Sequence, residues 1–151
     1  MRPKDAFYKM GTAVHRKIFN LSKGRIFATA LGMPLIELVS TGRRSGKERP
    51  TMLSVPIVEG ERLVLVASFG GDERHPAWYL NLQANPQVRI TMAGTTLTMN
   101  ARTATEQERE KLWAKITATF EGYARYQQRT ERQIPVVILE PPSSHASAWR
   151  S

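Results

Sequence analysis

The stretch TMLSVPIVEGERLVLVAS, Thr51 to Ser68, decides the fold class. Apolar and β-branched residues flank Glu59-Gly60, a pattern that predicts two strands joined in a hairpin at this dipeptide. Pro56 lies inside the first of these strands. Since proline cannot donate a ladder hydrogen bond, it indicates an edge strand or a bulge. A hairpin pairs its strands antiparallel, so the sequence predicts an antiparallel sheet.

The segments on either side add strands to this sheet. We predict a strand in PLIELVST (34–41), a second hairpin around Ala93-Gly94 in QVRITMAGTTLTMNARTAT (87–105) and a last strand in IPVVILEP (134–141). Strands do not alternate regularly with long helices, which argues against a doubly wound sheet. We therefore expect a mainly β, α+β domain. Its architecture would be a small antiparallel barrel that closes its edges, with helices packed outside and a ligand groove at the rim.

Two helices are predicted within this barrel domain. A short helix follows the glycine-bearing loop of SFGGDERHPAWYLNLQANP (68–86), with Pro76 in its first turn and Asn85-Pro86 at its end. Thr105 and Glu108 form a capping box that opens a longer helix. The apolar side of that helix consists of Leu112, Ile116 and Phe120.

The N-terminal segment has the spacing of a basic amphipathic helix. Apolar residues recur there three and four positions apart: Phe7, Met10, Val14, Ile18 and Leu21. Residues 1–25 hold seven basic residues against one acid, a net charge of +6 out of +9 for the whole chain. Such a helix either caps the core or lies on an anionic membrane surface. We divide the chain into this helix (1–25), the barrel domain (26–142) and a C-terminal tail (143–151).

Composition excludes several classes of chemistry and partner. The chain has no cysteine, and its three histidines are too scattered to pair as ligands, so no metal site is expected. No apolar run approaches the roughly 20 residues that span a bilayer. The segment before Ala28-Thr29-Ala30 is too polar for a signal peptide. We expect a cytoplasmic protein. Peripheral contact of residues 1–25 with the cytoplasmic face of a membrane is a further possibility. No nucleic-acid partner is expected, because no recognised binding motif is present.

A cationic turn follows the first predicted strand. LVSTGRRSGKERPTML, Leu38 to Leu53, carries four cations against one acid, Glu48; the cations are Arg43, Arg44, Lys47 and Arg49. Like charges this close repel one another, so the cluster gains nothing for folding. Arginine forks match phosphate oxygens two at a time, and Gly42 and Gly46 let backbone N–H groups approach closely, so the turn could hold a phosphate. The alternative is a solvated charged turn.

The loop and short helix of residues 68–86 form a second candidate site. Gly70-Gly71 can lie flat against a planar ligand because neither residue carries a Cβ. Trp78 could stack on such a ligand, and Asn81 could offer it an amide. The alternative for Trp78 is that it lies in the core one turn from Leu82.

Three aromatic residues form a third candidate. Phe120, Tyr123 and Tyr126 are spaced by three, which continues one helical face and favours core packing. Tyrosines at the mouth of a cavity can instead stack on a substrate and donate a proton.

No serine has the sequence pattern of a catalytic triad, and the acids cluster on one solvated helix. An enzyme of this composition would therefore need a bound organic cofactor for the difficult step.

Three segments resemble the deazaflavin-dependent nitroreductases of actinobacteria. TGRRSGKERP (41–50) resembles that family's TGRKSGKPR signature, and VASFGGDERHPAWYLNLQANPQVRI (66–90) resembles its ASKGG…HPxWYxNLxANPxV segment. RTERQIPVVILEP (129–141) is similar to its closing R-x-IPVxxLxP. The three segments keep the family's order, and together they run from about Leu35 to Pro141, a span that covers most of the chain.

This resemblance implies a split β-barrel related to flavin-binding oxidoreductases, and it implies the deazaflavin coenzyme F420. That coenzyme carries a phosphodiester and an anionic oligoglutamate tail, which the cationic turn would bind. The residues that would bind the coenzyme are Thr41, Gly42, Arg43, Arg44, Ser45, Gly46, Arg49, Ser54, Ala67, Ser68, Phe69, Gly70, Gly71, Trp78 and Asn81. The candidates for a catalytic proton donor are Tyr126, Tyr123 and Ser68.

The chain departs from the family pattern at three positions. Phe69 replaces the usual lysine of ASKGG, and Ser54 and Phe120 stand where the prodrug-activating relative has tyrosines. These departures are compatible with the coenzyme and count against nitroimidazole activity.

The resemblance implies hydride transfer from reduced F420 to an electron-poor small molecule: a quinone, an enone, an activated lactone or a nitroaromatic. Two other functions stay open, an FMN-dependent oxidoreductase of the same barrel class and a basic module that binds anionic lipid. The chain could be a monomer or a homodimer.

Overall fold

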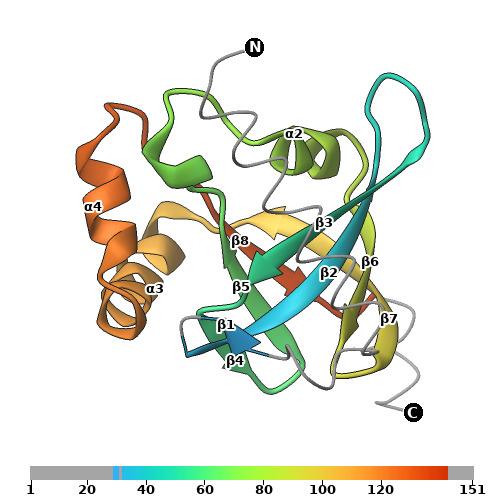
Figure 1. Ribbon diagram of the computed structural model, residues 1–151, viewed down its shortest axis with the longest axis horizontal. Coiled ribbons are helices and arrows are strands. Elements are labelled where there is room, and N and C mark those ends of the chain that lie inside the picture. The colour runs from blue at the N-terminus through green and yellow to red at the C-terminus, as the bar shows by residue number, and fades with distance from the viewer. Residues whose placement is uncertain (1–28, 31, 143–151) are drawn as a thin grey trace.

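The structure of the chain, a computed structural model, describes residues 29–30 and 32–142 (Figure 1). The predicted N-terminal helix (1–25) and C-terminal tail (143–151) lie outside these described residues. The described strands are β1 Thr29–Ala30, β2 Met33–Thr41, β3 Glu48–Ser54, β4 Ile57–Glu59, β5 Arg62–Val66, β6 Gln87–Met92, β7 Thr95–Thr103 and β8 Val136–Glu140. The described helices are the short 3-10 helix η1 Phe69–Gly71 and the α-helices α2 Ala77–Ala84, α3 Glu106–Thr119 and α4 Gly122–Gln128.

All eight described strands join one antiparallel sheet, which confirms the predicted fold class. The strand order is β1-β2-β6-β7-β8-β5-β4, and β3 pairs with β2 along its whole length. The sheet is not closed, which corrects the expectation of a barrel without edges: within the described residues, β3 and β4 share no ladder. Only Val55 and Pro56 separate these two edge strands along the chain. The sheet must therefore curl until its two edges nearly meet, which makes a split barrel (Figure 1).

The segment of residues 51–68 is more broken than its sequence predicts. The hairpin turn at Glu59-Gly60 is confirmed, with Gly60 at a φ of 58°. The residues before Pro56, however, pair with β2 rather than with β5. The N–H of Val55 still donates to the carbonyl of Pro34 at 2.8 Å, and Pro56 has no N–H with which to continue that pairing. One predicted strand is therefore two strands in different parts of the barrel wall.

Alternation along the strands divides the core into two layers. In β5, Leu63 and Leu65 belong to a cluster that fills the barrel, whereas Val64 and Val66 face a second cluster. The second cluster contains residues of α3, so this helix covers the outside of the sheet. Residues 136–139 of β8 are all buried because both faces of this strand are covered. Their run of β-branched residues and leucine is the pattern expected for such a strand.

The predicted helices are confirmed with small changes at their ends. Pro76 is the residue that precedes α2 rather than part of its first turn, and Asn85 ends the helix. The capping box at Thr105 and Glu108 is present at the start of α3. The prediction that Phe120 continues the apolar face of this helix is wrong, because the chain is extended at Phe120. A Cβ at Gly122 would overlap the Phe120 ring, so glycine allows the chain to turn here into a separate helix, α4.

Candidate active site

The turn between β2 and β3 is closed by its own backbone and by one serine. The N–H of Gly42 donates to the carbonyl of Lys47 at 2.8 Å, and the N–H of Gly46 donates to the carbonyl of Gly42 at 2.9 Å. The Ser45 hydroxyl accepts from the N–H of Lys47 at 3.1 Å and from Nη2 of Arg49 at 3.3 Å. These contacts hold the turn in shape while its long cationic side chains stay exposed.

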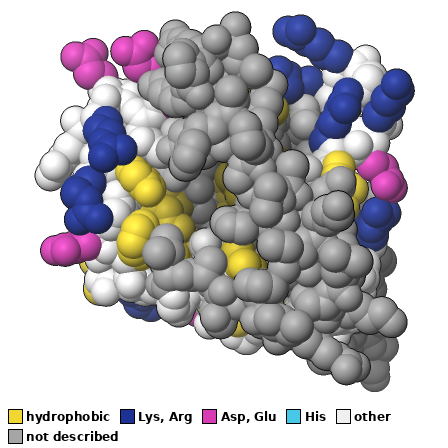
Figure 2. All heavy atoms as spheres, in the orientation of Figure 1, with side chains coloured by type: hydrophobic (Ala, Val, Ile, Leu, Met, Phe, Trp, Pro, Cys, Tyr) yellow, Lys and Arg dark blue, Asp and Glu magenta, His cyan; other side chains and the backbone are white. Residues whose placement is uncertain are grey.

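The positive charge of this turn is not neutralised within the described part of the chain. Its one acid, Glu48, accepts from both terminal nitrogens of Arg89, at 3.1 and 3.3 Å, and this hydrogen bonding holds the pKa of Glu48 below its usual value. The four cations of the turn form no ion pair with any described carboxylate. Figure 2 shows Lys and Arg side chains gathered at the corner where Figure 1 places this turn. The turn therefore carries an uncompensated positive charge that would attract an anion.

A buried asparagine ties the cationic turn to α2. Both the backbone N–H and Nη1 of Arg43 donate to Oδ1 of Asn81, at 3.2 and 2.9 Å. Nδ2 of Asn81 donates to the Ser40 hydroxyl at 3.3 Å, and Asn81 is only 4% exposed. The first two predicted motifs thus meet through one side chain. On the same helix, Trp78 is half-buried against the barrel core next to the buried Leu82, as the packing alternative predicts.

The loop after β5 has an unusual backbone. Phe69, Gly70 and Gly71 follow one another with φ values of 46°, 63° and 86°, and only glycine adopts such values without strain. A Cβ on Gly71 would lie 2.7 Å from the carbonyl oxygen of Tyr126, so this glycine is needed for the close approach of α4. Nη1 of Arg129 also donates to the carbonyl of Gly70 at 3.2 Å. The structure therefore brings the glycine loop together with Tyr126.

A cation also lies at the position where Phe69 replaces the family's lysine. The guanidinium of Arg74 is 5.4 Å from the centre of the Phe69 ring, within cation–π range. Arg74 also binds Asp72, whose carboxylate is buried, with Nη2 and Oδ2 3.1 Å apart. The loop thus keeps a positive group at this position, although that group is shared with a carboxylate.

The three aromatic residues form one edge-to-face cluster beside the loop. Ring centres are 5.3 Å apart for Phe120 and Tyr123 and 6.1 Å apart for Tyr123 and Tyr126. Tyr123 is 7% exposed, its hydroxyl donates to the sulfur of Met33, and burial raises its pKa to about 12. Tyr126 is half-buried, with the Arg129 guanidinium 5.5 Å from its ring centre. This favours a packing role for Tyr123 and leaves Tyr126 as the more accessible candidate for a proton donor.

Ser54 lies apart from the cationic turn. It pairs with Leu35 at the far end of β3, whereas Glu48 pairs with Thr41 at the turn. Glu48 and Ser54 are six residue steps apart along the strand, about 20 Å at 3.3 Å per step. Figure 1 places the β2–β3 turn and η1 on either side of α2 along one end of the barrel. Apart from Ser54, the residues predicted to bind the coenzyme therefore lie along this end of the barrel, with the cationic turn at one side.

Arg132, which was not predicted as a site residue, links the segment of residues 129–141 to the glycine-bearing loop after β5. Its Nε donates to the carbonyl of Asp72 at 2.8 Å, and its Nη2 donates to the carbonyls of Ala67 and Ser68 at 3.2 and 2.9 Å. Its Nη1 lies 3.2 Å from Nδ1 of His75. Burial and the charge of Arg132 lower the pKa of this histidine. Arg132 is the arginine of R-x-IPV, which was the one available signal in the sequence.

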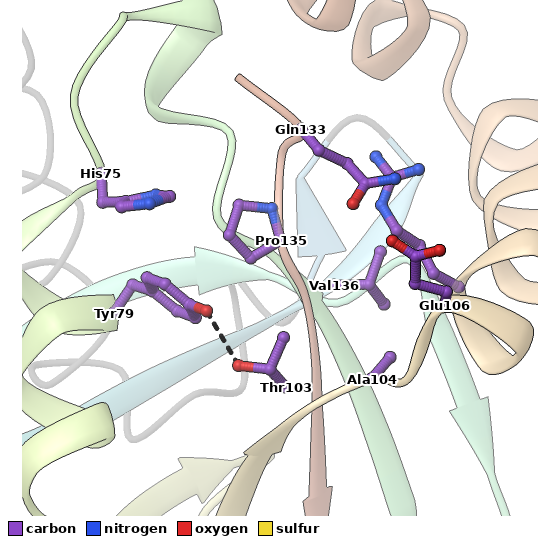
Figure 3. Close-up of a pocket in the computed structure, with 9 residues that line it drawn as sticks. His75, Tyr79, Thr103, Ala104, Glu106, Gln133, Pro135 and Val136 are labelled. Carbon is purple, nitrogen blue, oxygen red and sulfur yellow. Dashed lines mark hydrogen bonds between the residues drawn. The ribbon is translucent and has the colours of Figure 1, made fainter.

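One described pocket, of about 230 Å³, lies beside this arginine but outside the predicted site (Figure 3). His75 and Tyr79 line one side of it and Gln133 the other, and the Tyr79 hydroxyl hydrogen-bonds that of Thr103 at 2.8 Å. None of the residues predicted to bind a coenzyme or donate a proton lines this pocket. We assign it no ligand.

The fold and site together define a class of protein. A split barrel whose end combines a cationic turn, a left-handed glycine loop and an aromatic cluster is suited to a large anionic redox cofactor, as in the split-barrel oxidoreductases. Comparison with known proteins identifies the family within this class. A sequence model of F420H(2)-dependent quinone reductases matches residues 12–141, and the chain belongs to this family.

Individual relatives agree with this assignment. An F420H(2)-dependent quinone reductase of Mycobacterium tuberculosis H37Rv is 35% identical over 130 residues, which cover 83% of this chain and 87% of the relative. A solved F420-H2 dependent reductase, FDR-A, is 39% identical and superposes with a TM-score of 0.64, covering 71% of this chain and 94% of that one. A structure described as a domain-swapped dimer is 34% identical with a TM-score of 0.66, covering 85% and 96%.

The expected cofactor is thereby confirmed as coenzyme F420, in preference to FMN. The residues present fit this coenzyme. An exposed turn with four cations and no described carboxylate partner suits a phosphodiester and an oligoglutamate tail. The assignment of individual residues to the coenzyme stays a proposal.

Proposed function

We propose that this chain is an F420H2-dependent quinone reductase that binds its coenzyme along the end of the barrel marked by the cationic turn, α2 and η1. The observation that carries the proposal is that three motifs, separated by tens of residues, meet there through Arg43, Asn81 and Arg132. The bound coenzyme supplies a hydride from its deazaflavin ring. One hydride and one proton convert a quinone into its hydroquinone, so the protein must align the acceptor and provide or admit that proton.

The cationic turn would bind the anionic part of the coenzyme. Arg43 cannot be neutralised by Asn81, because an amide oxygen carries no full charge, so the hydrogen bonds orient its guanidinium and leave its charge available. Arg44 and Lys47 are exposed on the same turn. Their exposure allows them to follow a flexible oligoglutamate tail.

The loop of residues 67–71 and Tyr126 would serve the reacting end. The absence of a side chain at Gly70 allows close approach of a planar ring. The Tyr126 hydroxyl is the proposed proton donor to the quinone oxygen, with the Ser68 hydroxyl as a second candidate. The aromatic cluster would exclude water from one side of the acceptor.

The proposal is tested in two steps with the purified full chain. Quenching of F420 fluorescence measures coenzyme binding, and FMN serves as the competing ligand. Stopped-flow mixing of the F420H2 complex with menadione then follows the return of oxidised F420. We expect saturable binding of F420 and reoxidation whose rate rises with menadione concentration. A preference for FMN, or F420H2 that persists in the presence of quinones, would contradict the proposal. The same assay ranks enones, activated lactones and nitroaromatics as acceptors.

Two further properties of the chain are part of the proposal. None of the described helices has the length and apolar content needed to cross a bilayer. We infer a cytoplasmic protein whose residues 1–25, with a net charge of +6, contact anionic lipid, where quinones dissolve. Co-sedimentation with anionic vesicles should fall when residues 1–25 are deleted and should be unaffected by deletion of residues 143–151. Light scattering would decide between a monomer and a homodimer.

A further inference from the structure

We infer that Arg132 is a positioning residue that fixes the coenzyme loop, defined here as residues 67–75, in the conformation that receives the coenzyme. The inference rests on the proposed function, because it assigns this loop to the coenzyme. It concerns a residue that no prediction from the sequence had placed in the site.

Among the described residues outside the loop, Arg132 makes more side-chain hydrogen bonds to the loop than any other. One guanidinium reaches three of the loop's carbonyls and one imidazole nitrogen: Ala67 O, Ser68 O, Asp72 O and His75 Nδ1, all within 3.2 Å. A planar fork with five N–H donors can do this, whereas an ammonium group cannot match the spread of acceptors. Its neighbour Arg129 makes a single bond to the loop and is exposed.

The backbone on either side of Arg132 is itself held by Gln127 of α4. Nε2 of Gln127 donates to the carbonyl of Arg132 at 2.7 Å, and Oε1 of the same glutamine accepts from the N–H of Ile134 at 2.9 Å. The N–H of Ala67 donates to the carbonyl of Pro135 at 3.0 Å. The loop is therefore fastened to the segment that leads directly into β8, the most buried strand.

The loop needs such an anchor because its backbone is strained. Phe69 has a side chain and a φ of 46°, a conformation that an L-residue keeps only when its surroundings enforce it. Within the loop, the N–H groups of Gly71 and Asp72 donate to the carbonyls of Ser68 and Phe69, which closes only one tight turn. Neither bond connects that turn to the rest of the barrel.

Fixing two carbonyls also fixes two donors. A trans peptide is planar, with its C=O and N–H groups pointing in opposite directions. Because the carbonyls of Ala67 and Ser68 accept from Arg132, the N–H groups of Ser68 and Phe69 point away from it. These donors belong to the segment predicted to meet the coenzyme. Loss of Arg132 would remove this donor from the Ala67 carbonyl and would leave the Ser68 carbonyl with only the N–H of Gly71, so both peptide groups would be held less firmly.

The experiment compares wild type, Arg132→Ala and Arg132→Lys, with Arg125→Ala as the matched control. Arg125 is exposed on α4 and binds no loop carbonyl. Hydrogen exchange of residues 68–72 is measured in the coenzyme-free proteins, and F420 affinity is measured by fluorescence. We expect Arg132→Ala to speed exchange in the loop but not in β8, and to weaken F420 binding by about tenfold or more. Arg132→Lys should recover little of either, and millimolar methylguanidinium should restore F420 binding to Arg132→Ala.

Each outcome decides a separate point. If wild type does not bind F420, the proposed function fails, and the coenzyme part of this inference fails with it. If wild type binds F420 and Arg132→Ala binds it equally well, the inference alone fails. Exchange that rises throughout the sheet would also overturn the inference, because it would show that Arg132 stabilises the whole fold. Full recovery in Arg132→Lys would overturn it too, because it would show that a positive charge suffices without directed hydrogen bonds. Should Arg132→Ala not fold, Arg132→Lys carries the same comparison.

Discussion

Asn81 shows how one side chain gives a charged residue a direction. Its carbonyl oxygen receives two hydrogen bonds from Arg43, while its amide nitrogen is used by Ser40 in the barrel wall. An aspartate in its place would neutralise the charge of Arg43. A leucine would accept no hydrogen bond, so the orientation of the guanidinium would not be fixed. The amide satisfies both needs, because it accepts strongly without carrying charge. The motif WYxN is thus explained by a contact with the cationic turn, in addition to any contact with a ligand.

The arginine pair is the most direct test at this scale. Changing Arg43 and Arg44 together to Ala should weaken F420 binding by roughly 10–1,000-fold, at about 1.5–3 kcal/mol per charge-assisted contact with losses that do not add fully. Fluorescence titration measures the effect, and raising ionic strength should weaken wild type more than the double variant. Lys111→Ala, an exposed cation on α3, is the control. Equal affinity in wild type and double variant would remove the anion-binding role of the turn.

Tyr126 is tested separately from coenzyme binding. Tyr126→Phe removes one hydroxyl and keeps the ring that packs on Tyr123 and Phe120. We expect the rate of quinone reduction to fall by about 10²-fold or more, as for a lost general acid, while F420 affinity stays unchanged. Tyr123→Phe should have little effect on rate, since that hydroxyl faces the Met33 sulfur. An unaffected rate in Tyr126→Phe would move the proton donor to Ser68 or to water.

At the scale of elements, α3 is secured to the sheet by charge at its first turn. Arg102 of β7 donates from both terminal nitrogens to Glu108, at 2.7 and 2.9 Å, and from Nε to Glu140 of β8 at 2.7 Å. Glu108 also accepts from the N–H of Thr105 at 2.9 Å, as the capping box requires. The carboxylate of Glu108 therefore caps the start of the helix. Through Arg102, it also links the helix to β7 and β8.

This network predicts a dependence of stability on pH. The Arg102 hydrogen bonds and the cap lower the pKa of Glu108 from 4.5 to about 2. A carboxyl whose pKa is lower in the folded state stabilises the fold above about pH 4.5, and this contribution is lost as pH falls from there towards 2. Because the side chain is 31% exposed, solvent screening limits the loss to about 1 kcal/mol.

Urea unfolding, followed by tryptophan fluorescence between pH 3 and pH 7, measures this effect. Glu108→Gln should be less stable than wild type at pH 7, and the difference should shrink towards pH 3. Glu110→Gln, an exposed neighbour on the same helix, serves as the control. Parallel curves for wild type and Glu108→Gln across the whole range would contradict the network's role.

The elements themselves were predictable where a local signal was strong. Both hairpin turns, the final strand and the capping box are confirmed, since each depends on neighbouring residues. The break at Phe120 was not predictable from spacing, because it depends on how the ring packs over Gly122. The separation of β3 from β4 depends on long-range pairing with β2. Arg132 was missed for a related reason: its acceptors are backbone carbonyls, which leave no trace in side-chain patterns.

At the scale of the whole molecule, the open barrel places the motifs together. The sheet curls because two residues connect its edge strands, and α2 then lies across the barrel end between the cationic turn and η1 (Figure 1). The family assignment confirms the predicted class of enzyme and its coenzyme. Most of the residues proposed to bind the coenzyme are distributed over this end, so the proposed site depends on the curl of the whole sheet rather than on any single element.

A crystal structure of the protein with F420 would show directly which residues hold the coenzyme. We predict a binding mode with oxygens of the phosphodiester or of the glutamate tail at hydrogen-bonding distance, about 2.7–3.2 Å, from the guanidinium groups of Arg43 or Arg44. This binding mode also places the deazaflavin ring against Ser68 and Gly70. A coenzyme bound elsewhere, such as in the pocket beside His75 and Tyr79, with both arginines facing bulk water, would contradict it.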